Sequence, residues 1–115
     1  MISFLHSALD LVMIMSYDYH ELNRTSINAP LNRENNQNPY TETVSENIDR
    51  FLAQGCHRDK LIMGIPTYGR TYTLQNAYWT DVDTPVDGLG EPGPYTLSSG
   101  SLGFNEVKYL TTACK

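Results

Sequence analysis

Two polar clusters, each following a short apolar run, carry the residue types from which a binding site is built. Tyr17-Asp18-Tyr19-His20 follows the apolar residues 11–15 after Ser16, and Thr67-Tyr68-Gly69-Arg70 follows the apolar residues 61–65 after Pro66. Tyrosine rings pack on the apolar faces of sugar rings, while carboxylate, guanidinium and phenol groups hydrogen-bond hydroxyls and amides. This composition suits a carbohydrate. A structural network, with Asp18 and Arg70 as an ordinary ion pair, explains the same residues equally well.

The elements around these clusters predict a β-α-β unit. The two apolar runs, LVMIM and LIMGI, are typical of strands buried on both faces of a parallel sheet. Between them, residues 43–54 predict a helix, with a capping box from Thr43 to Glu46 and Gly55 at its end. Ligands of parallel α/β proteins lie beyond the carboxyl ends of the strands, so we expect both clusters to share one crevice.

The pattern changes after Arg70, where we place a domain boundary between residues 1–70 and 71–115. Residues 71–74 predict a short strand, and residues 87–95 are dense in Gly and Pro, which predicts turns. Short strands separated by turns favour a β-rich second module. Between the first strand and the helix, residues 21–40 predict a polar loop without helix or strand.

Composition excludes several classes of protein. The chain has 115 residues and a formal net charge of −5 without a basic cluster, which argues against nucleic acid as a partner. No apolar run approaches the ~20 residues that span a bilayer, so we expect no membrane insertion. No Cys or His spacing suits a metal, and we expect no cofactor. Cys56 and Cys114 allow a mutual disulfide, pairing elsewhere, or free thiols.

The clusters also resemble those of a known family. Met15-Ser16-Tyr17-Asp18 resembles the M-x-Y-D motif on the sixth barrel strand of family 18 glycoside hydrolases, the chitinases and chitinase-like lectins. Asn28-Ala29-Pro30-Leu31 resembles the family's N-[AS]-P-L loop, and residues 60–70 resemble its seventh strand. Residues 90–96 resemble the start of its insertion domain. The resemblance covers nearly the whole chain, in order and spacing.

This resemblance implies a fold and a ligand. The fold would be α/β, a segment of a (β/α)8 TIM barrel (residues 1–70) followed by the start of an α+β insertion domain (71–115). A complete barrel needs about 250 residues, more than this chain has. The ligand would be chitin, a β-1,4-linked N-acetylglucosamine polymer, and the location extracellular, although residues 1–19 do not read as a secretory signal.

The resemblance also implies roles for individual residues. Met15 would form the floor of the sugar pocket. Tyr17 would hold the substrate's N-acetyl group so that it attacks the anomeric carbon of the same sugar. Asp18 would bind the sugar and alter the electrostatic field near the catalytic acid. Tyr68 and Arg70 would hydrogen-bond sugars across the cleft. In this family the substrate's acetamide replaces the enzyme nucleophile.

Departures from the family pattern leave the enzymatic role open. The motif D-x-x-D-x-D-x-E, which holds the family's catalytic acid, does not occur in the chain. His20-Glu21-Leu22-Asn23 stands where the family commonly has H-G-x-W, and Leu97-Ser98 replaces a basic-acidic pair. The parent protein is thus expected to be a chitinase or, alternatively, an inactive chitin-binding lectin. Asn23-Arg24-Thr25 is a glycosylation sequon in a secreted protein, and a chance match otherwise.

Overall fold

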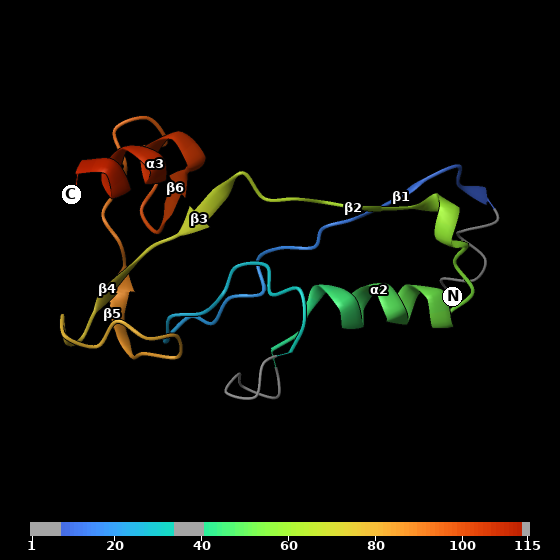
Figure 1. Ribbon diagram of the computed structural model, residues 1–115, viewed down its shortest axis with the longest axis horizontal. Helices are drawn as coiled ribbons and strands as arrows, with labels where there is room; N and C mark the ends of the chain where they lie inside the picture. Colours follow the sequence, from blue (N-terminus) through green and yellow to red (C-terminus); the bar gives the residue numbers. More distant parts are fainter. Residues whose placement is uncertain (1–7, 34–40, 114–115) are drawn as a thin grey trace. The chain divides into compact units, whose positions relative to one another are not determined.

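The computed structural model describes residues 8–33 and 41–113, which form two units. Unit 1 comprises residues 8–19, 29–33 and 41–65, and unit 2 comprises residues 20–28 and 66–113. In chain order the elements are β1 (Val12–Ile14), α2 (Val44–Ala53), a 3-10 turn (Arg58–Lys60), β2 (Leu61–Met63), β3 (Tyr68–Arg70), β4 (Tyr72–Leu74), β5 (Val86–Leu89), β6 (Ser101–Gly103) and α3 (Phe104–Ala113) (Figure 1). Residues 1–7 and 34–40 lie outside the described residues. The expectation that residues 1–19 are not a secretory signal therefore falls partly on residues that are not described.

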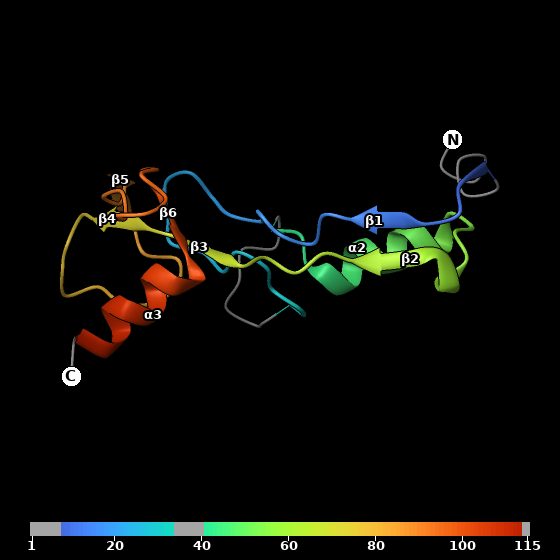
Figure 2. The same ribbon diagram turned by 90° about the horizontal axis from the view of Figure 1, so that it is seen from above.

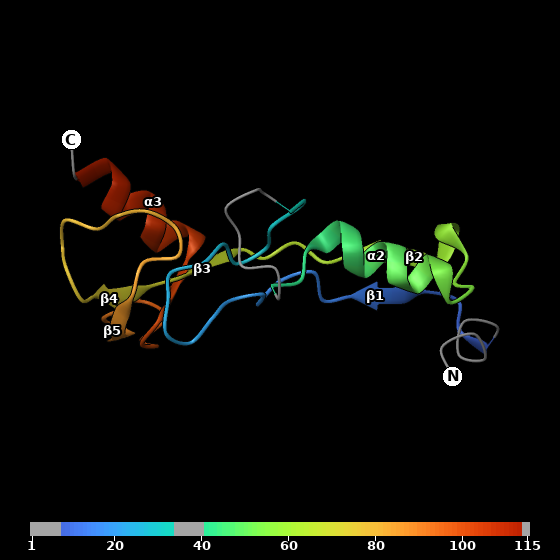
Figure 3. The same ribbon diagram turned by 90° about the horizontal axis from the view of Figure 1, so that it is seen from below.

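Unit 1 contains the predicted parallel strand pair. β1 and β2 pair in parallel, with Val12 opposite Leu61 and Ile14 opposite Met63. The two strands lie side by side with α2 alongside them (Figures 2 and 3). Parallel neighbours need a crossover connection, and α2 supplies it. Together these elements form a mixed helix-and-strand unit of α/β type, as the sequence predicted.

Helix α2 begins and ends as its sequence predicts. The Thr43 hydroxyl accepts from the Glu46 amide, and the Glu46 carboxylate accepts from the Thr43 amide, which completes the capping box. Arg33 donates to both Glu46 oxygens at 2.8 Å, and this contact lowers the pKa of Glu46. At the other end Gly55 takes a φ of 89°, a left-handed conformation that favours glycine.

The expected burial of both strand faces is wrong for this chain. Ile14 is buried, but Met13 is 75% exposed, and Ile62 and Met63 are also exposed. The physical reason is that a two-stranded sheet with one helix beside it has only one covered face. The predicted polar loop is confirmed for residues 21–33, where Arg24 forms an isolated bridge to Pro85 and no helix or longer strand occurs.

Unit 2 is built from antiparallel pairs. β4 pairs with β5, with an irregularity between Thr73 and Leu74, and β3 pairs with β6. The predicted strand at 71–74 is thus confirmed, but the expectation of turns throughout residues 87–95 is wrong, because residues 87–89 belong to β5. Antiparallel pairing with β4 gives these glycine-rich residues the backbone hydrogen bonds that hold them extended. At Gly90 the chain crosses Thr71 so closely that a Cβ would lie 2.6 Å from the Thr71 Oγ1 atom.

Helix α3, which the sequence pattern did not reveal, is fixed by the buried carboxylate of Glu106. Its Oε1 accepts from the amides of Tyr95 (2.8 Å) and Thr96 (2.9 Å), and its Oε2 accepts from the Gly103 amide (2.6 Å). The Thr96 amide, aided by the other donors and opposed by burial, lowers the pKa of Glu106 to about 2. A Cβ on Gly93 would collide with this carboxylate. Among the described residues, no helix is both long and apolar enough to span a bilayer.

We expect Glu106 to make the stability of unit 2 depend on pH. Because folding favours the carboxylate form, its stabilisation is complete above the pKa of an unfolded glutamate, about 4.3, and is lost as the pH falls toward about 2. Glu106→Gln should lower stability at pH 7 and flatten this dependence. Urea unfolding at pH 7, 4.5 and 2.5, followed by the emission of Trp79 in unit 2, measures both effects.

Glu91→Gln is the matched control, since Glu91 is exposed. It should leave the midpoint at pH 7 nearly unchanged. A Glu106→Gln protein that keeps the wild-type pH dependence would contradict this role of the carboxylate.

Candidate functional site

The candidate site in unit 1 begins where β1 ends. The Ile14 carbonyl accepts from the Ser16 amide at 3.0 Å, from the Gly64 amide at 2.9 Å and from the Ser16 hydroxyl at 3.3 Å. Ser16 is 1% exposed, so its hydroxyl is satisfied inside the unit. These bonds turn the chain sharply at the carboxyl end of the strand and fix the start of the polar cluster that follows.

Tyr17 is positioned by the absence of a side chain at Gly64. A Cβ on Gly64 would lie 2.9 Å from Tyr17 Cε1 and 2.9 Å from the Ile14 carbonyl oxygen, closer than such atoms approach in proteins. The phenol ring therefore lies against the bare backbone at the end of β2. Glycine permits this close approach at the carboxyl edge of the sheet, where the polar cluster begins.

The next two residues are held by different means. Asp18 is exposed and has a φ of 65°, a left-handed conformation that Asp tolerates better than most residues. Tyr19 is tied to α2, because the Asn47 side-chain amide donates to the Tyr19 hydroxyl at 2.7 Å. The helix therefore orients the segment that carries Tyr17 and Asp18.

Met15 lines a cavity of about 360 Å³ in unit 1. The cavity lies between β1 and α2 and is also lined by Met13, Ile14, Asn47, Arg50 and Phe51. Met15 itself is 73% exposed. Its thioether presents an apolar and polarisable surface beside the polar cluster.

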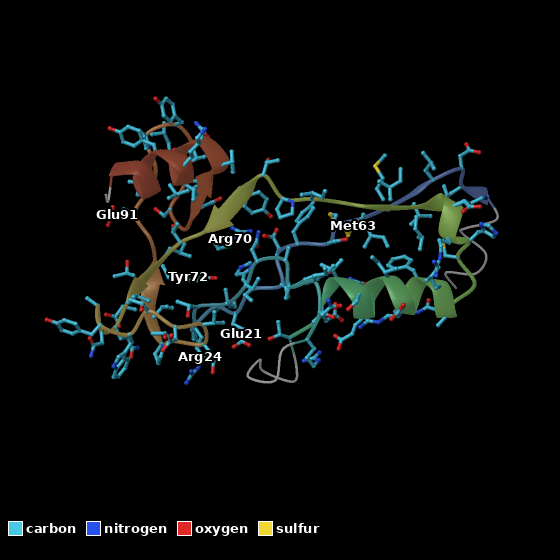
Figure 4. All side chains as sticks on the ribbon, viewed as in Figure 1. Glu21, Arg24, Met63, Arg70, Tyr72 and Glu91 are labelled. Carbon is cyan, nitrogen blue, oxygen red and sulfur yellow. The ribbon has the colours of Figure 1, made fainter. Side chains whose placement is uncertain are left out.

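Tyr68 and Arg70 occupy alternate positions of β3 in unit 2. They pair with Gly103 and Ser101 of β6, which fixes the strand that carries them. The Arg70 guanidinium carbon lies 5.3 Å from the centroid of the Tyr68 ring, a cation–π distance. Arg70 and Tyr72 mark the junction of β3 and β4 in Figure 4. The pair thus offers a half-buried phenol and guanidinium on one strand.

The two predicted clusters fall in different units. Met15, Tyr17 and Asp18 belong to unit 1, whereas Tyr68 and Arg70 belong to unit 2. Their meeting in one crevice stays a prediction, as does the alternative ion pair between Asp18 and Arg70. The division of the chain at residue 70 into a barrel segment and an insertion domain also stays a prediction. The two units of the structure divide between residues 65 and 66, and residues 20–28 belong to unit 2.

The sequon and the cysteines can be placed in part. Asn23 is exposed in a bend of unit 2, and its backbone carbonyl accepts from the Val86 amide at 3.1 Å. Cys56 is buried and forms no disulfide with another described residue. Cys114 lies outside the described residues. Within residues 8–33 and 41–113, no group of three or more metal-ligating side chains gathers.

Two residues that position the site carry little signal in the sequence. Gly64 reads as part of an apolar strand, although a glycine inside such a run indicates a close backbone approach. Asn47 reads as an ordinary polar residue of α2. Its spacing of one helical turn from Thr43 and Phe51 places it on the side of α2 that lines the cavity with Phe51.

The comparisons with known proteins identify the family. The family model of Glycosyl hydrolases family 18 matches residues 2–112. The chain belongs to this family. It is 42% identical over 102 residues to "Probable chitinase 2" of Drosophila melanogaster, an alignment covering 86% of this chain and 20% of the relative. The resemblance seen in the sequence is therefore confirmed.

Solved structures of family members agree with this fold. The Ostrinia furnacalis Group IV chitinase matches with a TM-score of 0.88 and 32% identity, over 97% of this chain and 32% of that chain. Human YKL-39, described as a pseudo-chitinase with retained chitooligosaccharide binding, matches with a TM-score of 0.86 and 32% identity, over 96% of this chain and 32% of that chain. The chain spans only about a fifth of the length of two curated relatives that it matches, the Drosophila protein and "Chitotriosidase-1" of Mus musculus.

We expect Gly64→Ala to destabilise unit 1 and displace the Tyr17 ring. The new methyl group would overlap both a backbone carbonyl and the ring, and overpacking of this kind costs about 1–3 kcal/mol. Urea unfolding and the chemical shifts of the Tyr17 ring protons measure the effect. Gly88→Ala is the control, because a Cβ at that strand position would meet no atom within 4 Å. Equal stability of the two variants would rule out the close approach.

Proposed function

We propose that this family 18 chain binds chitin oligosaccharide through Tyr17, Asp18, Met15, Tyr68 and Arg70. The observation that carries the proposal is the seating of Tyr17 and Asp18 directly beyond the carboxyl end of β1, with the Tyr17 ring against Gly64. Ligands of parallel α/β proteins bind at this edge. YKL-39, a relative with retained chitooligosaccharide binding, supports a sugar of this class.

The unit 1 residues have complementary roles in this proposal. The Tyr17 hydroxyl bonds the N-acetyl group of one sugar, and the exposed Asp18 carboxylate accepts from a sugar hydroxyl or acetamide. Met15 offers an apolar surface to the same sugar. In unit 2, Tyr68 and Arg70 donate to further sugar oxygens, and their mutual cation–π contact keeps both groups oriented.

In the same proposal, hydrolysis proceeds in the full-length parent and is assisted by the substrate. Tyr17 holds the acetamide so that its oxygen attacks the anomeric carbon of the same sugar, which takes the place of a protein nucleophile. A general acid must protonate the leaving oxygen, a contribution of roughly 10²–10⁴-fold. This chain contributes the acetamide-binding half of that chemistry. Residues 1–70 are proposed as a segment of a TIM barrel, and residues 71–115 as the start of its insertion domain.

A second function, sugar binding without hydrolysis, is favoured by one feature of the chain. Asn23 stands where the family commonly carries a stacking Trp, and its exposed bend is held by backbone pairing with Val86. The lost contact concerns the acceptor side of the family's cleft, where a hydrolase holds the sugar that leaves. The coding transcript, read through the codon for Met1, separates the two functions. An upstream D-x-x-D-x-D-x-E motif supports the chitinase, and a replaced Glu supports the lectin.

We expect the chain to bind N-acetylglucosamine tetramer and Tyr17→Phe to weaken that binding about tenfold. The variant loses one hydroxyl and keeps the ring against Gly64, and one hydrogen bond corresponds to roughly one factor of ten. Arg70→Lys should weaken binding as well, because Lys lacks the planar guanidinium. Isothermal titration calorimetry measures the affinity of each protein.

Tyr109→Phe is the matched control, since Tyr109 is exposed on α3 and lies outside the proposed site. It should bind like the wild type. The proposal fails when neither the wild-type chain nor any variant binds the tetramer, or when Tyr17→Phe binds as tightly as the wild type.

We also propose an extracellular location with an N-linked glycan on Asn23. The supporting observation is the exposure of Asn23 in a bend. Expression behind a secretory leader in a eukaryotic host should give a product whose mobility increases after treatment with peptide N-glycosidase. Asn23→Gln should abolish that increase.

Thr25→Ser is the informative control for this modification. The Thr25 hydroxyl donates to the Asp81 carbonyl and accepts from the Thr84 amide, both at 2.9 Å, so Thr25→Ala would disturb the fold together with the sequon. Thr25→Ser keeps both the hydroxyl and the sequon, and its product should remain glycosylated. A wild-type product that the glycosidase does not shift would overturn the assignment.

A further inference from the structure

The turn between β4 and β5 exposes two adjacent aromatic side chains. Tyr78 is 92% exposed and Trp79 is 52% exposed. Trp79 is the only tryptophan in the chain. Neither residue belongs to a helix or strand, and neither belongs to the sugar-binding residues proposed above.

The backbone of this turn is held at its start by a local hydrogen-bond pattern. The Asn76 side-chain oxygen accepts from the Tyr78 amide at 3.0 Å, and the Asn76 carbonyl accepts from the Trp79 amide at 3.0 Å. This is the way in which an Asn side chain stabilises a turn. Both aromatic residues are therefore presented from a fixed backbone.

The far side of the turn is anchored to residues 20–28 of the same unit. Besides its bonds to Asp81 and Thr84, Thr25 accepts through its carbonyl from the Asp83 amide at 2.8 Å. The Thr84 hydroxyl also donates to the Asp81 carbonyl at 2.8 Å, and Arg24 forms an ion pair with Asp83 at 3.3 Å. A turn fixed at both ends loses little conformational entropy when its side chains bind a ligand.

Tyr78 and Trp79 differ from the other exposed apolar side chains in being two aromatic residues that are adjacent in the sequence. Met13 and Ile62 lie on paired strands, and Phe104 and Leu110 lie on a helix. Tyr95 is also exposed in a turn, but it presents a single ring. Tyr and Trp also carry a hydroxyl and an indole N–H beside an apolar ring, the combination that fits the alternating apolar and polar surface of a sugar.

Charge distinguishes a neutral sugar from the other ligands that aromatic rings bind. Asp81 and Asp83 follow the aromatic pair, and the chain carries a net charge of −5. Phosphate groups of nucleic acids and anionic lipid surfaces would be repelled, since both are recognised by Lys and Arg. An uncharged ligand meets no such repulsion, and carboxylates accept hydrogen bonds from its hydroxyls.

We propose that Tyr78 and Trp79 form a second sugar-binding point, at which their rings stack on N-acetylglucosamine units of chitin. The identity of the sugar rests on the proposed function, whereas the presence of the aromatic platform rests on this turn alone. The platform lies wholly in unit 2 and requires none of the sugar contacts proposed for Tyr17. Two linked contacts on one polymer raise the overall affinity without a new site for chemistry.

The unique tryptophan makes the test direct. The full chain, produced without a glycan in a bacterial host, is titrated with N-acetylglucosamine hexamer while the emission of Trp79 is recorded. Stacking should shift the emission to shorter wavelength with saturation, because the half-exposed indole leaves water. Tyr78→Ala keeps the reporter and should weaken the affinity seen in emission by roughly tenfold.

Sedimentation with insoluble chitin tests the tryptophan itself. Trp79→Ala should reduce retention on chitin, while Trp79→Phe keeps an aromatic ring and should preserve most of it. Tyr109→Ala, an exposed aromatic residue on α3, should bind like the wild type. Circular dichroism of every variant checks that unit 2 remains folded.

The outcomes separate this inference from the proposed function. A shift in Trp79 emission that persists in Tyr17→Phe supports the platform. This result stands even when Tyr17→Phe binds as tightly as the wild type in calorimetry, which would refute the cleft assignment alone. Calorimetric binding of the hexamer with unchanged Trp79 emission overturns the platform and leaves the cleft intact. An equal emission shift with a glucose hexamer of the same linkage overturns the assignment to N-acetylglucosamine.

Discussion

The contact between the Tyr17 ring and the bare backbone of Gly64 is the constraint on which the candidate site depends. It joins the ends of two parallel strands and leaves no space for even a methyl group. The Ile14 carbonyl accepts from Gly64 and from Ser16 at the same point, so the turn after β1 and the approach of β2 are set by one oxygen atom. Tyr17 and Asp18 come next in the chain, so these contacts restrict the positions that their backbone can take.

Glu106 performs the corresponding task in unit 2. Its carboxylate connects three backbone amides of the 95–96 turn and the end of β6, and β6 is the strand that pairs with Tyr68 and Arg70. The groups on β3 that we propose bind sugar are therefore held by a carboxylate that is itself buried among backbone amides. Gly93 allows this arrangement, since any side chain there would occupy the place of the carboxylate.

How far the sequence predicts this structure depends on how local each signal is. The capping box from Thr43 to Glu46 and the glycine after α2 act within a few residues, and both are confirmed. β5 was hidden because Asp87 and Gly88 have low strand propensity, and only pairing with β4 makes them extended. The attachment of residues 20–28 to unit 2 depends on the bonds of Thr25 with Asp81 and Thr84, which lie far along the chain. The cluster residues were found by type, whereas Gly64 was not, because its importance comes from the ring that lies against it.

The exposed strand faces and the fixed polar residues of unit 1 have different physical origins. A pair of parallel strands with one helix cannot cover both of its faces, so Met13 and Ile62 remain exposed. The polar residues at the carboxyl edge do not share this dependence. Tyr17 is fixed by Gly64, and Tyr19 is fixed by Asn47, all within unit 1. Because both contacts are made before any ligand arrives, the cost of ordering these side chains on binding is small. In the proposed function, Gly64 and Asn47 contribute to affinity without contacting the sugar, through the geometry that they impose on Tyr17 and Tyr19.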